Sequence, residues 1–404
     1  MTAVSTDTGA RRLTDEAEAL AVADSLASAF AAGASERDAH RRLPHAELDA
    51  LAASGLLAIT VPRRFGGLDA SAATLSRVIA VLSAADPSIG QIPQSHFTFA
   101  EALRRGGSEA LQERVFGQLL DGGRLANAQT ERGGKTVTDD ATRIVDEGGT
   151  LFLDGTKYYC TGAGFADLLA VRAVVHDGPA QRKVIAYLPA DTPGVTVVDD
   201  WDGFGQRTTG SGTVRFDRVA VDPAALLDFS ALLARPSTYG ARAQLIHAAI
   251  DTGIARGALT AAAEVVTGAR PWFEAGVDRA QDDPYLIAQA GELEVTVRGA
   301  EALLAAAAAR IDEADAADEP ERAAISEASL ATAAAKVAAG RAARAAGAEL
   351  FDFGGTRTAA AAANHSRFWR DARTHTLHDP ERWKLHHLGR WALSGQIPPT
   401  HTSL

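Results

Sequence analysis

Two histidines three residues apart, with an aspartate directly after the second, are the side chains of this chain best suited to acid–base chemistry. They are His375, His378 and Asp379, in the stretch RDARTHTLHDP that spans residues 370–380. Residues three apart lie on one face of a helix, so we expect both imidazoles to point into one pocket beside a carboxylate. Histidine can donate or accept a proton near neutral pH because its ordinary pKa is about 6.5.

We expect no metal at this histidine pair. Histidines three apart can bind zinc, but no carboxylate–histidine pattern elsewhere in the chain completes a set of ligands. The single cysteine, Cys160, has no base beside it and is interpreted as a small packed residue. A lone histidine such as His96 is usually structural, and His386 and His387 are interpreted as surface residues.

Composition excludes several classes of protein. The chain has 404 residues and a net charge of −11, which argues against nucleic acid as the main partner. One cysteine excludes an internal disulfide. We see no signal peptide and no apolar run that approaches the roughly 20 residues of a membrane span. These features predict a cytoplasmic protein of two or three domains.

Hydrophobic periodicity divides the chain into three zones, which we predict to be an N-terminal α-helical domain (1–122), a central β domain (123–233) and a C-terminal four-helix bundle (234–404). Within the last zone, Gly253 and Gly257 share a face with Ile246, Ile250 and Ile254 and would allow a close helix contact. In the central zone, β-rich runs without intervening helices predict an antiparallel barrel or sandwich. We expect one hairpin and four further strands there, at residues 142–154, 168–175, 184–188, 195–198 and 213–221.

The segments that lead into the histidine pair resemble the C-terminal domain of acyl-CoA dehydrogenases. The sequence ELFDFGGTRT at 349–358 is followed by FWRDAR at 368–373, and the order helical, β, helical bundle is also that of the family. The resemblance covers nearly the whole chain and implies the α+β acyl-CoA dehydrogenase fold. Those enzymes continue with a tyrosine and a catalytic glutamate followed by glycine, where this chain has His378, Asp379 and Pro380. Asp379 is one methylene shorter than the usual base.

Two segments of the central zone resemble the parts of this fold that contact a flavin. They read NAQTERGG at 127–134 and GTKYYCTG at 155–162, and taken alone each is a strand end that enters a turn. A flavin needs hydrogen bonds to its ring heteroatoms and apolar cover for its faces. The resemblance implies that the first segment meets the pyrimidine edge of the ring and that the second covers the ring near N5. The implied contact residues are Asn127, Gln129, Thr130, Tyr159 and Thr161.

Further strings resemble a subgroup of this fold, the flavin-dependent monooxygenases typified by dibenzothiophene monooxygenase and the related sulfur-acquisition oxidoreductases. These strings are DWDGFGQRTTGSGT at 200–213, which adds Trp201 to the implied cofactor contacts, and ARPW at 269–272. Dehydrogenases have Arg–x–x–Phe–Gly at the second place, and its arginine reaches the flavin phosphates of a neighbouring subunit. Arg270 and Phe273 keep this pattern but Glu274 replaces the glycine, so we expect FMN, with FAD as the alternative.

The same resemblance implies a homo-oligomer. If Arg270 and the Gly354-Gly355 turn grip the flavin of a neighbour, as in the family, the active unit is at least a dimer. The fold usually forms a tetramer.

The subgroup also implies a reaction. In a two-component monooxygenase, a separate NAD(P)H-dependent flavin reductase supplies reduced FMN, which reacts with O₂ to give a C4a-hydroperoxide that oxygenates a small organosulfur compound. The protein must keep that peroxide dry. The resemblance implies that Thr161 holds N5 and the peroxide, that His96 and His378 orient peroxide and substrate, and that His375 and Asp379 position His378.

Three alternatives stay open at this point. An acyl-CoA dehydrogenase would bind FAD tightly and accept electrons from an acyl-CoA. An N- or C-hydroxylase of secondary metabolism would use the same scaffold on nitrogen or carbon. A non-catalytic flavin-fold binding protein would consume no oxygen with any reductant.

Overall fold

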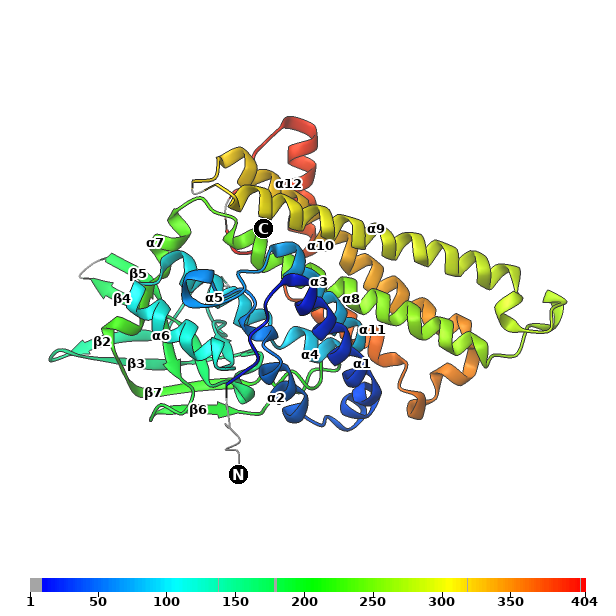
Figure 1. Cartoon of the computed structure of the whole chain (residues 1–404), viewed down its shortest axis with the longest axis horizontal. Helices are drawn as coiled ribbons and strands as arrows, with labels where there is room; N and C mark the ends of the chain where they lie inside the picture. Colours follow the sequence, from blue (N-terminus) through cyan, green and yellow to red (C-terminus); the bar gives the residue numbers. More distant parts are fainter. Residues whose placement is uncertain (1–8, 137, 178–179, 318, 400) are drawn as a thin grey trace, which may run out of the picture.

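Helices surround one side of a twisted sheet and extend away from it in a bundle of long helices (Figure 1). The computed structural model describes residues 9–136, 138–177, 180–317, 319–399 and 401–404. In chain order these form six helices, a sheet and then a second set of helices. The expected fold class is therefore confirmed.

The N-terminal helices are held in place by capping residues at their starts. The side chains of Asp15, Ser71 and Ser108 accept hydrogen bonds from backbone N–H groups in the first turns of α1, α3 and α6, as good N-caps do. The helices are α1 (Glu16–His40), α2 (His45–Ala53), α3 (Ala72–Ala85), α4 (Pro87–Gln91), α5 (Gln94–Gly106) and α6 (Glu109–Leu120).

Helix α1 corrects one expectation from the sequence. By length and composition it qualifies as a helix that could cross a membrane, although we expected no run of that kind. Its alanines give it the required hydropathy, and its charged residues gather toward its two ends. In the fold, Ala19, Ala23 and Phe30 of α1 are buried in the core that α3 and α8 share. The same composition therefore serves helix packing here.

The central domain is a mixed sheet, with strand order β6-β7-β3-β2-β4-β5-β8. The hairpin and the four further strands are where the sequence predicted them. A wholly antiparallel sheet was wrong, because β1 and β2 both pair in parallel with β4, whose ten residues are long enough for both. The strands are β1 (Leu125–Ala128), β2 (Arg143–Glu147), β3 (Thr150–Lys157), β4 (Leu168–Asp177), β5 (Ala180–Pro189), β6 (Val195–Val198), β7 (Thr213–Val221) and β8 (Leu226–Asp228).

Three long helices dominate the C-terminal domain, and shorter helices pack beside them. The predicted close contact at Gly253 and Gly257 is confirmed, and it joins α8 to α3. A Cβ atom on Gly253 would lie 2.3 Å from the carbonyl oxygen of Ala80, and one on Gly257 2.4 Å from that of Ala84. The helices are α7 (Phe229–Ala234), α8 (Tyr239–Thr267), α9 (Pro284–Asp315), α10 (Arg322–Glu349), α11 (Ser366–His375) and α12 (Glu381–Ser394).

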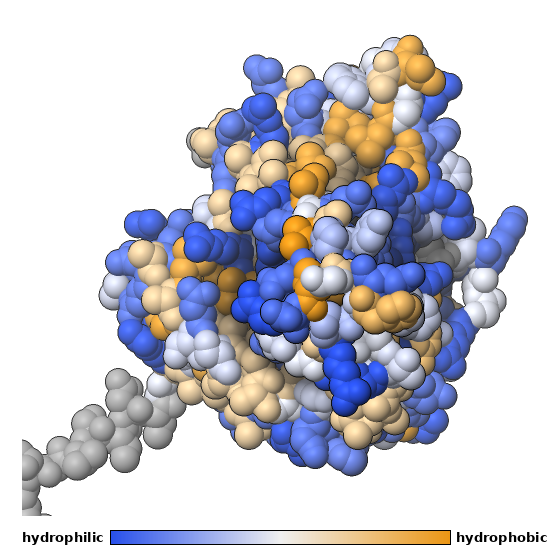
Figure 2. Space-filling model, turned by 90° about the vertical axis from the view of Figure 1, so that its right-hand side faces the viewer, coloured by the Kyte–Doolittle hydropathy of each residue, from blue (hydrophilic) through white to orange (hydrophobic). Residues whose placement is uncertain are grey.

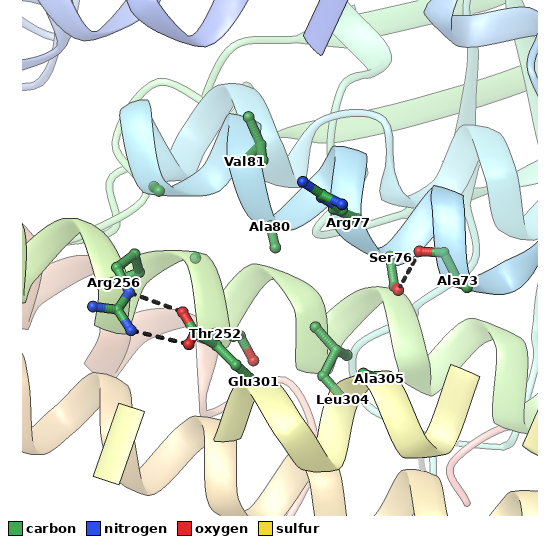
Figure 3. Close-up of a pocket in the computed structure, with 12 residues that line it drawn as sticks. Ala73, Ser76, Arg77, Ala80, Val81, Thr252, Arg256, Glu301, Leu304 and Ala305 are labelled. Atoms are coloured by element: carbon green, nitrogen blue, oxygen red, sulfur yellow. Dashed lines mark hydrogen bonds and ion pairs between the residues drawn. The ribbon is translucent and has the colours of Figure 1, made fainter. Parts of the chain in front are cut away.

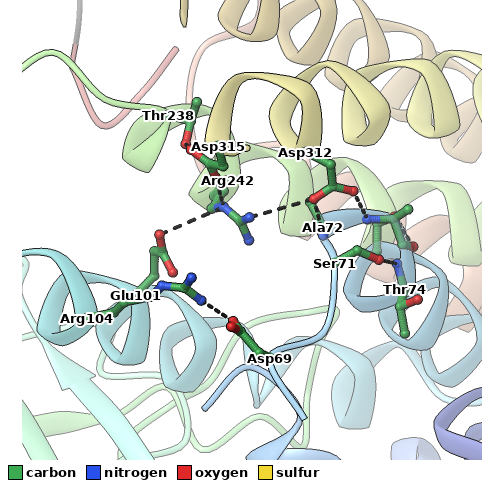
Figure 4. A network of polar contacts seen from close by, with 12 residues as sticks. Asp69, Ser71, Ala72, Thr74, Glu101, Arg104, Thr238, Arg242, Asp312 and Asp315 are labelled. Atoms are coloured by element: carbon green, nitrogen blue, oxygen red, sulfur yellow. Dashed lines mark hydrogen bonds and ion pairs between the residues drawn. The ribbon is translucent and has the colours of Figure 1, made fainter. Parts of the chain in front are cut away.

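A polar network fixes the first helical domain against the second (Figure 4). Asp312 of α9 accepts a hydrogen bond of 2.7 Å from the backbone N–H of Ala72, at the first turn of α3. Arg242 of α8 pairs with Asp315 at 2.6 Å and lies 3.8 Å from Glu101 of α5. Helix α5, which carries His96, is therefore held against the C-terminal helices.

Candidate functional site

A buried lysine joins the two segments that resemble flavin contacts. The Lys157 ammonium, at the end of β3, is fully buried and donates to the backbone oxygen of Gln129 at 3.1 Å. It also pairs with Glu131 at 2.6 Å and with Asp140 at 3.2 Å. The segment after β1 is thereby held beside the segment after β3. We did not single out Lys157 from the sequence; it lies four residues after Leu153, the other buried residue of β3.

One atom of the first segment is buried without a hydrogen-bond partner. It is the side-chain oxygen of Asn127, whereas the Gln129 amide donates to the backbone oxygen of Ala170 at 2.7 Å. Buried polar atoms are rarely left unpaired, so an orphaned acceptor here suits the N–H donor of a bound ring. Thr130 pairs with Tyr158 through the backbone, at 2.8 Å. These residues fit the edge of a flavin.

The second segment forms an aromatic wall with a loop that precedes β7. The Tyr159 ring, half exposed, meets the Trp201 ring edge to face, with centroids 6.4 Å apart. Tyr159 has a φ of +57°, a strained value for a side chain of its size. The Thr161 hydroxyl lies 2.8 Å from that of Ser211, a residue that the sequence did not mark. Burial raises the pKa of the Cys160 thiol to about 12, which supports its interpretation as a packed residue.

His96 has no free ring nitrogen in this structure. Its Nε2 lies 2.7 Å from the carbonyl oxygen of Leu57, and its Nδ1 accepts from the backbone N–H of Leu125 at 3.1 Å. Burial lowers its pKa to about 4, so the ring is neutral at physiological pH. The expected role of His96 in orienting peroxide and substrate therefore has no nitrogen to act through. The ring instead fixes the first residue of β1, the strand that leads to Asn127.

His375 lies at the end of α11 and is fully buried against α8. Its Nδ1 is 2.5 Å from a carboxylate oxygen of Asp251, whose other oxygen is 2.6 Å from the Lys336 ammonium. Its Nε2 is 3.1 Å from Nδ1 of His247. The sequence marked none of these three partners. Asp251 and His247 lie four apart on α8, a helical spacing that would have placed them on one face.

His378 lies beyond the end of α11, so the two marked histidines do not share a helix face as expected. They are brought together by a third ring, because His247 contacts both. The ring centroids of His247 and His378 are 3.9 Å apart, with planes tilted by 31°. The His378 side chain is 46% exposed, so this is the open end of the cluster.

Asp379 is engaged with neighbouring cations. One of its oxygens pairs with the buried Lys384 ammonium, and the other lies 3.7 Å from Nδ1 of His378. Although burial raises the pKa of Asp379, contacts with His378, Lys336 and Lys384 bring it well below the ordinary value. The carboxylate is therefore charged but occupied, which suits support of His378 rather than attack on a substrate proton.

The remaining predicted cofactor residues lie at the far end of the bundle. Phe273 is 78% exposed in the connection between α8 and α9, which Figure 1 places at the right-hand end, away from the sheet. Arg270 lies in the same exposed connection. Gly354 packs on Val265 near the end of α8, so the Gly354-Gly355 turn approaches this connection. Within one chain these residues do not join the histidine site.

A large cavity lies apart from the candidate site. It has a volume of about 460 Å³ and lies between α3, α8 and α9 (Figure 3). Alanines and Leu304 line much of it, and Arg256 in its wall is bound to Glu301 at 2.8 Å. None of the histidines contributes to this wall. Within the ranges that the structure describes, no group of three or more His, Cys, Asp and Glu side chains is arranged to hold a metal ion.

A buried carboxyl beside the site predicts a dependence of stability on pH. Burial, helped by the charge of Asp38, raises the pKa of Asp371 from 3.8 to about 7, and the carboxyl accepts from the backbone N–H of Gln206 at 2.5 Å. A raised pKa in the folded state stabilises the fold below pH 4, and this contribution is lost as the pH rises to 7.

We therefore expect Asp371→Asn to be more stable than the unmodified chain at pH 8 but not at pH 4. Asparagine is neutral and keeps the acceptor oxygen. The gain is at most about 4 kcal/mol, because one pKa unit corresponds to about 1.4 kcal/mol. Urea unfolding of both proteins at the two pH values measures it. An equal stability difference at both would contradict the raised pKa.

Comparisons with known proteins agree with the order of domains described above. Family models described as the N-terminal, middle and C-terminal domains of acyl-CoA dehydrogenase match residues 14–123, 126–219 and 245–380. The chain is 36% identical over 400 residues, 95% of each protein, to a dibenzothiophene monooxygenase of Rhodococcus qingshengii. It is 33% identical to a Pseudomonas putida protein named as a probable FMNH2-dependent monooxygenase, SfnC, over 94% of this chain and 96% of that one.

A solved structure extends the similarity to three dimensions. FMN-bound TdsC from Paenibacillus sp. A11-2 superposes with a TM-score of 0.90 at 34% identity, over 96% of this chain and 100% of that one. The arrangement of helices and sheet described above is therefore shared with a protein crystallised with FMN.

Proposed function

We infer the function from one premise: this chain belongs to the acyl-CoA dehydrogenase family and, within it, to the flavin-dependent monooxygenases related to dibenzothiophene monooxygenase. It is an FMN-dependent monooxygenase that oxygenates an organosulfur compound. This conclusion rests on the residues found at the position where dehydrogenases have their catalytic glutamate. Asp379 is bound to Lys384 there, and a half-exposed imidazole, His378, stands beside it.

The residues around β1 and β3 fit FMN, which supplies the redox chemistry with oxygen when it is bound. The orphaned oxygen of Asn127, with Gln129 and Thr130 on the same segment, would hold the pyrimidine edge of the ring. Tyr159 and Trp201 provide an aromatic wall that excludes water. Thr161, aligned by Ser211, would hold a hydrogen bond near N5.

We assign the proton chemistry to His378, the most exposed of the three clustered imidazoles. Its Nδ1 lies 3.7 Å from the carboxylate of Asp379, which helps to orient the ring. An imidazole in this place could donate a proton to the oxygen atom that is not transferred to the substrate. His375 and Asp379 position it, while His96 positions β1.

The family implies a flavin reductase as the source of reduced FMN. We also propose that the protein is a homotetramer in the cytoplasm. Support for assembly comes from apolar side chains that are exposed on α9 and α12: Tyr285 by 83%, Val295 by 72% and Leu393 by 90%. In Figure 2, orange apolar side chains gather at the top of the face shown, the end at which Figure 1 places α12. Arg270 and Phe273, remote from the site of their own chain, would then reach a neighbour's FMN.

Removal of the orphaned acceptor tests the FMN site. We expect Asn127→Ala to bind FMN about tenfold more weakly, the cost of one lost hydrogen bond of about 1.4 kcal/mol. Titration calorimetry with FMN measures the affinity, and Thr192→Ala, in an exposed loop of the same domain, should bind as the unmodified chain does. Equal affinities of the two variants would remove Asn127 from the site.

The reaction is tested by supplying reduced FMN through a flavin reductase and offering separate substrates in air. The set consists of an aromatic sulfide such as dibenzothiophene, an alkyl sulfinate, an aromatic amine and an acyl-CoA. We expect an oxygenated product from an organosulfur compound and no reduction of bound flavin by the acyl-CoA under anaerobic conditions. Reduction by the acyl-CoA, without any oxygenated product, would contradict the function.

A further inference from the structure

A histidine that the sequence did not mark lies between the two that it did. His247 is buried on α8, and its Nδ1 is 3.1 Å from Nε2 of His375. Its ring lies against the ring of His378 at 3.9 Å between centroids. Among the side-chain contacts described, His247 links the hydrogen-bonded group of Lys336, Asp251 and His375 to the ring of His378, whose backbone N–H also donates to the carbonyl of His375 at 3.0 Å.

The charged carboxylate of Asp251 determines the direction of the hydrogen bonds that link Asp251, His375 and His247. Contacts with His375 and Lys336 keep the pKa of Asp251 below its ordinary value although burial raises it, so the carboxylate only accepts. His375 must then carry its proton on Nδ1, facing Asp251. Burial lowers the pKa of His375, so its Nε2 is a bare acceptor. His247 must therefore carry its proton on Nδ1 and have a bare Nε2.

The surroundings keep His247 neutral. Burial is the main cause of its lowered pKa, and His378, His375, Lys336 of α10 and Lys384 of α12 lower it further. Asp251 lies on the same helix, and its two oxygens are engaged by His375 and Lys336. A neutral ring packed against the ring of His378 exerts no charge repulsion on a proton there. It also offers a flat ring face, on which the His378 ring rests with planes tilted by 31°.

We propose that His247 is a positioning residue: Asp251 and His375 lock it as the neutral Nδ1–H tautomer, and its ring face holds the His378 ring in place for proton donation. This rests on the proposed role of His378, but the tautomer does not depend on any reaction. The two parts are therefore tested separately.

The tautomer is tested on the flavin-free protein by neutron diffraction from deuterium-exchanged crystals. We expect deuterium on Nδ1 and none on Nε2 at both His247 and His375. Deuterium on Nε2 of His247 would overturn the proposal, whatever the activity of the enzyme.

Asp251→Asn should reverse the direction of the hydrogen bonds that link residue 251, His375 and His247. The asparagine oxygen turns to Lys336 and its amide donates to Nδ1 of His375, so the protons of His375 and His247 move to Nε2. Asp140→Asn, which alters a second buried carboxylate with several cationic partners in the β domain, should leave the His247 proton on Nδ1. An unchanged His247 in a folded Asp251→Asn protein would show that Asp251 does not set the tautomer and would overturn the lock.

The role of the ring face is tested in the enzyme supplied with reduced FMN. His247→Phe keeps an aromatic face and His247→Ala removes it. We expect the phenylalanine variant to retain most of the coupling of oxygen consumption to product, and the alanine variant to lose it about tenfold. An equal loss of coupling in His247→Phe and His247→Ala, with both variants folded, would overturn the proposal.

Discussion

His378→Ala is expected to lower the rate of substrate oxygenation by about 10²–10⁴-fold, the range for removal of a positioned general acid. Oxygen should still be consumed but should leave as hydrogen peroxide, because the residues that we assign to the flavin ring lie on the β domain and do not include His378. The binding of FMN should stay unchanged for the same reason. Product and peroxide, measured per oxygen consumed, give the coupling.

A neighbouring histidine provides the control for this substitution. His387 lies on α12, where its ring contacts Trp383 and His386 and none of the clustered histidines. His387→Ala should oxygenate substrate as the unmodified enzyme does. If His378→Ala kept its coupling, or if both variants lost it equally, His378 would not be the proton donor.

Lys157→Met should destabilise the fold by about 3–5 kcal/mol, the usual cost of removing one partner from a buried ion pair. The substitution keeps an unbranched side chain of nearly the same length but leaves Glu131 and Asp140 without the ammonium that they share. The two segments assigned to FMN would separate, so FMN affinity should fall as well. Urea unfolding and calorimetry measure the two effects.

Lys183→Met is the matched control, since Lys183 pairs with the same Asp140 at 3.1 Å but is 31% exposed. Ion pairs near the surface contribute about 0–1 kcal/mol, so this variant should be nearly as stable as the unmodified chain. Equal and small losses in the two variants would show that Lys157 does not hold the segments together.

The parts of the fold that the sequence predicted are those with a local signal. Alternation of apolar and polar residues located β7 to the residue, a β-rich run located β6, and a glycine pair located the hairpin of β2 and β3. The parallel pairing of β1 and β2 with β4 has no such signal, because it depends on strands far apart in the chain. The division at 122 and 233 stays a prediction about domain boundaries.

The candidate site was predicted in part for the same reason. His378 and Asp379 stood out because they are neighbours in sequence, and Tyr159 because its segment resembles known ones. The partners of His375 were missed, since Asp251 is 124 positions away and its role is visible only when α8 and α11 pack together. The interpretation of His96 as an orienting group required its ring nitrogens to be free, and backbone contacts with Leu57 and Leu125 occupy both.

A single turnover with labelled oxygen tests whether the protein transfers oxygen from O₂ to sulfur. The protein is loaded with FMN, reduced without air, and mixed with ¹⁸O₂ and an aromatic sulfide, and the product is analysed by mass spectrometry. We expect one ¹⁸O atom per oxygenated sulfur and less free hydrogen peroxide than in reduced FMN without protein. Peroxide equal to the oxygen consumed, with no label in any tested sulfur compound, would contradict it.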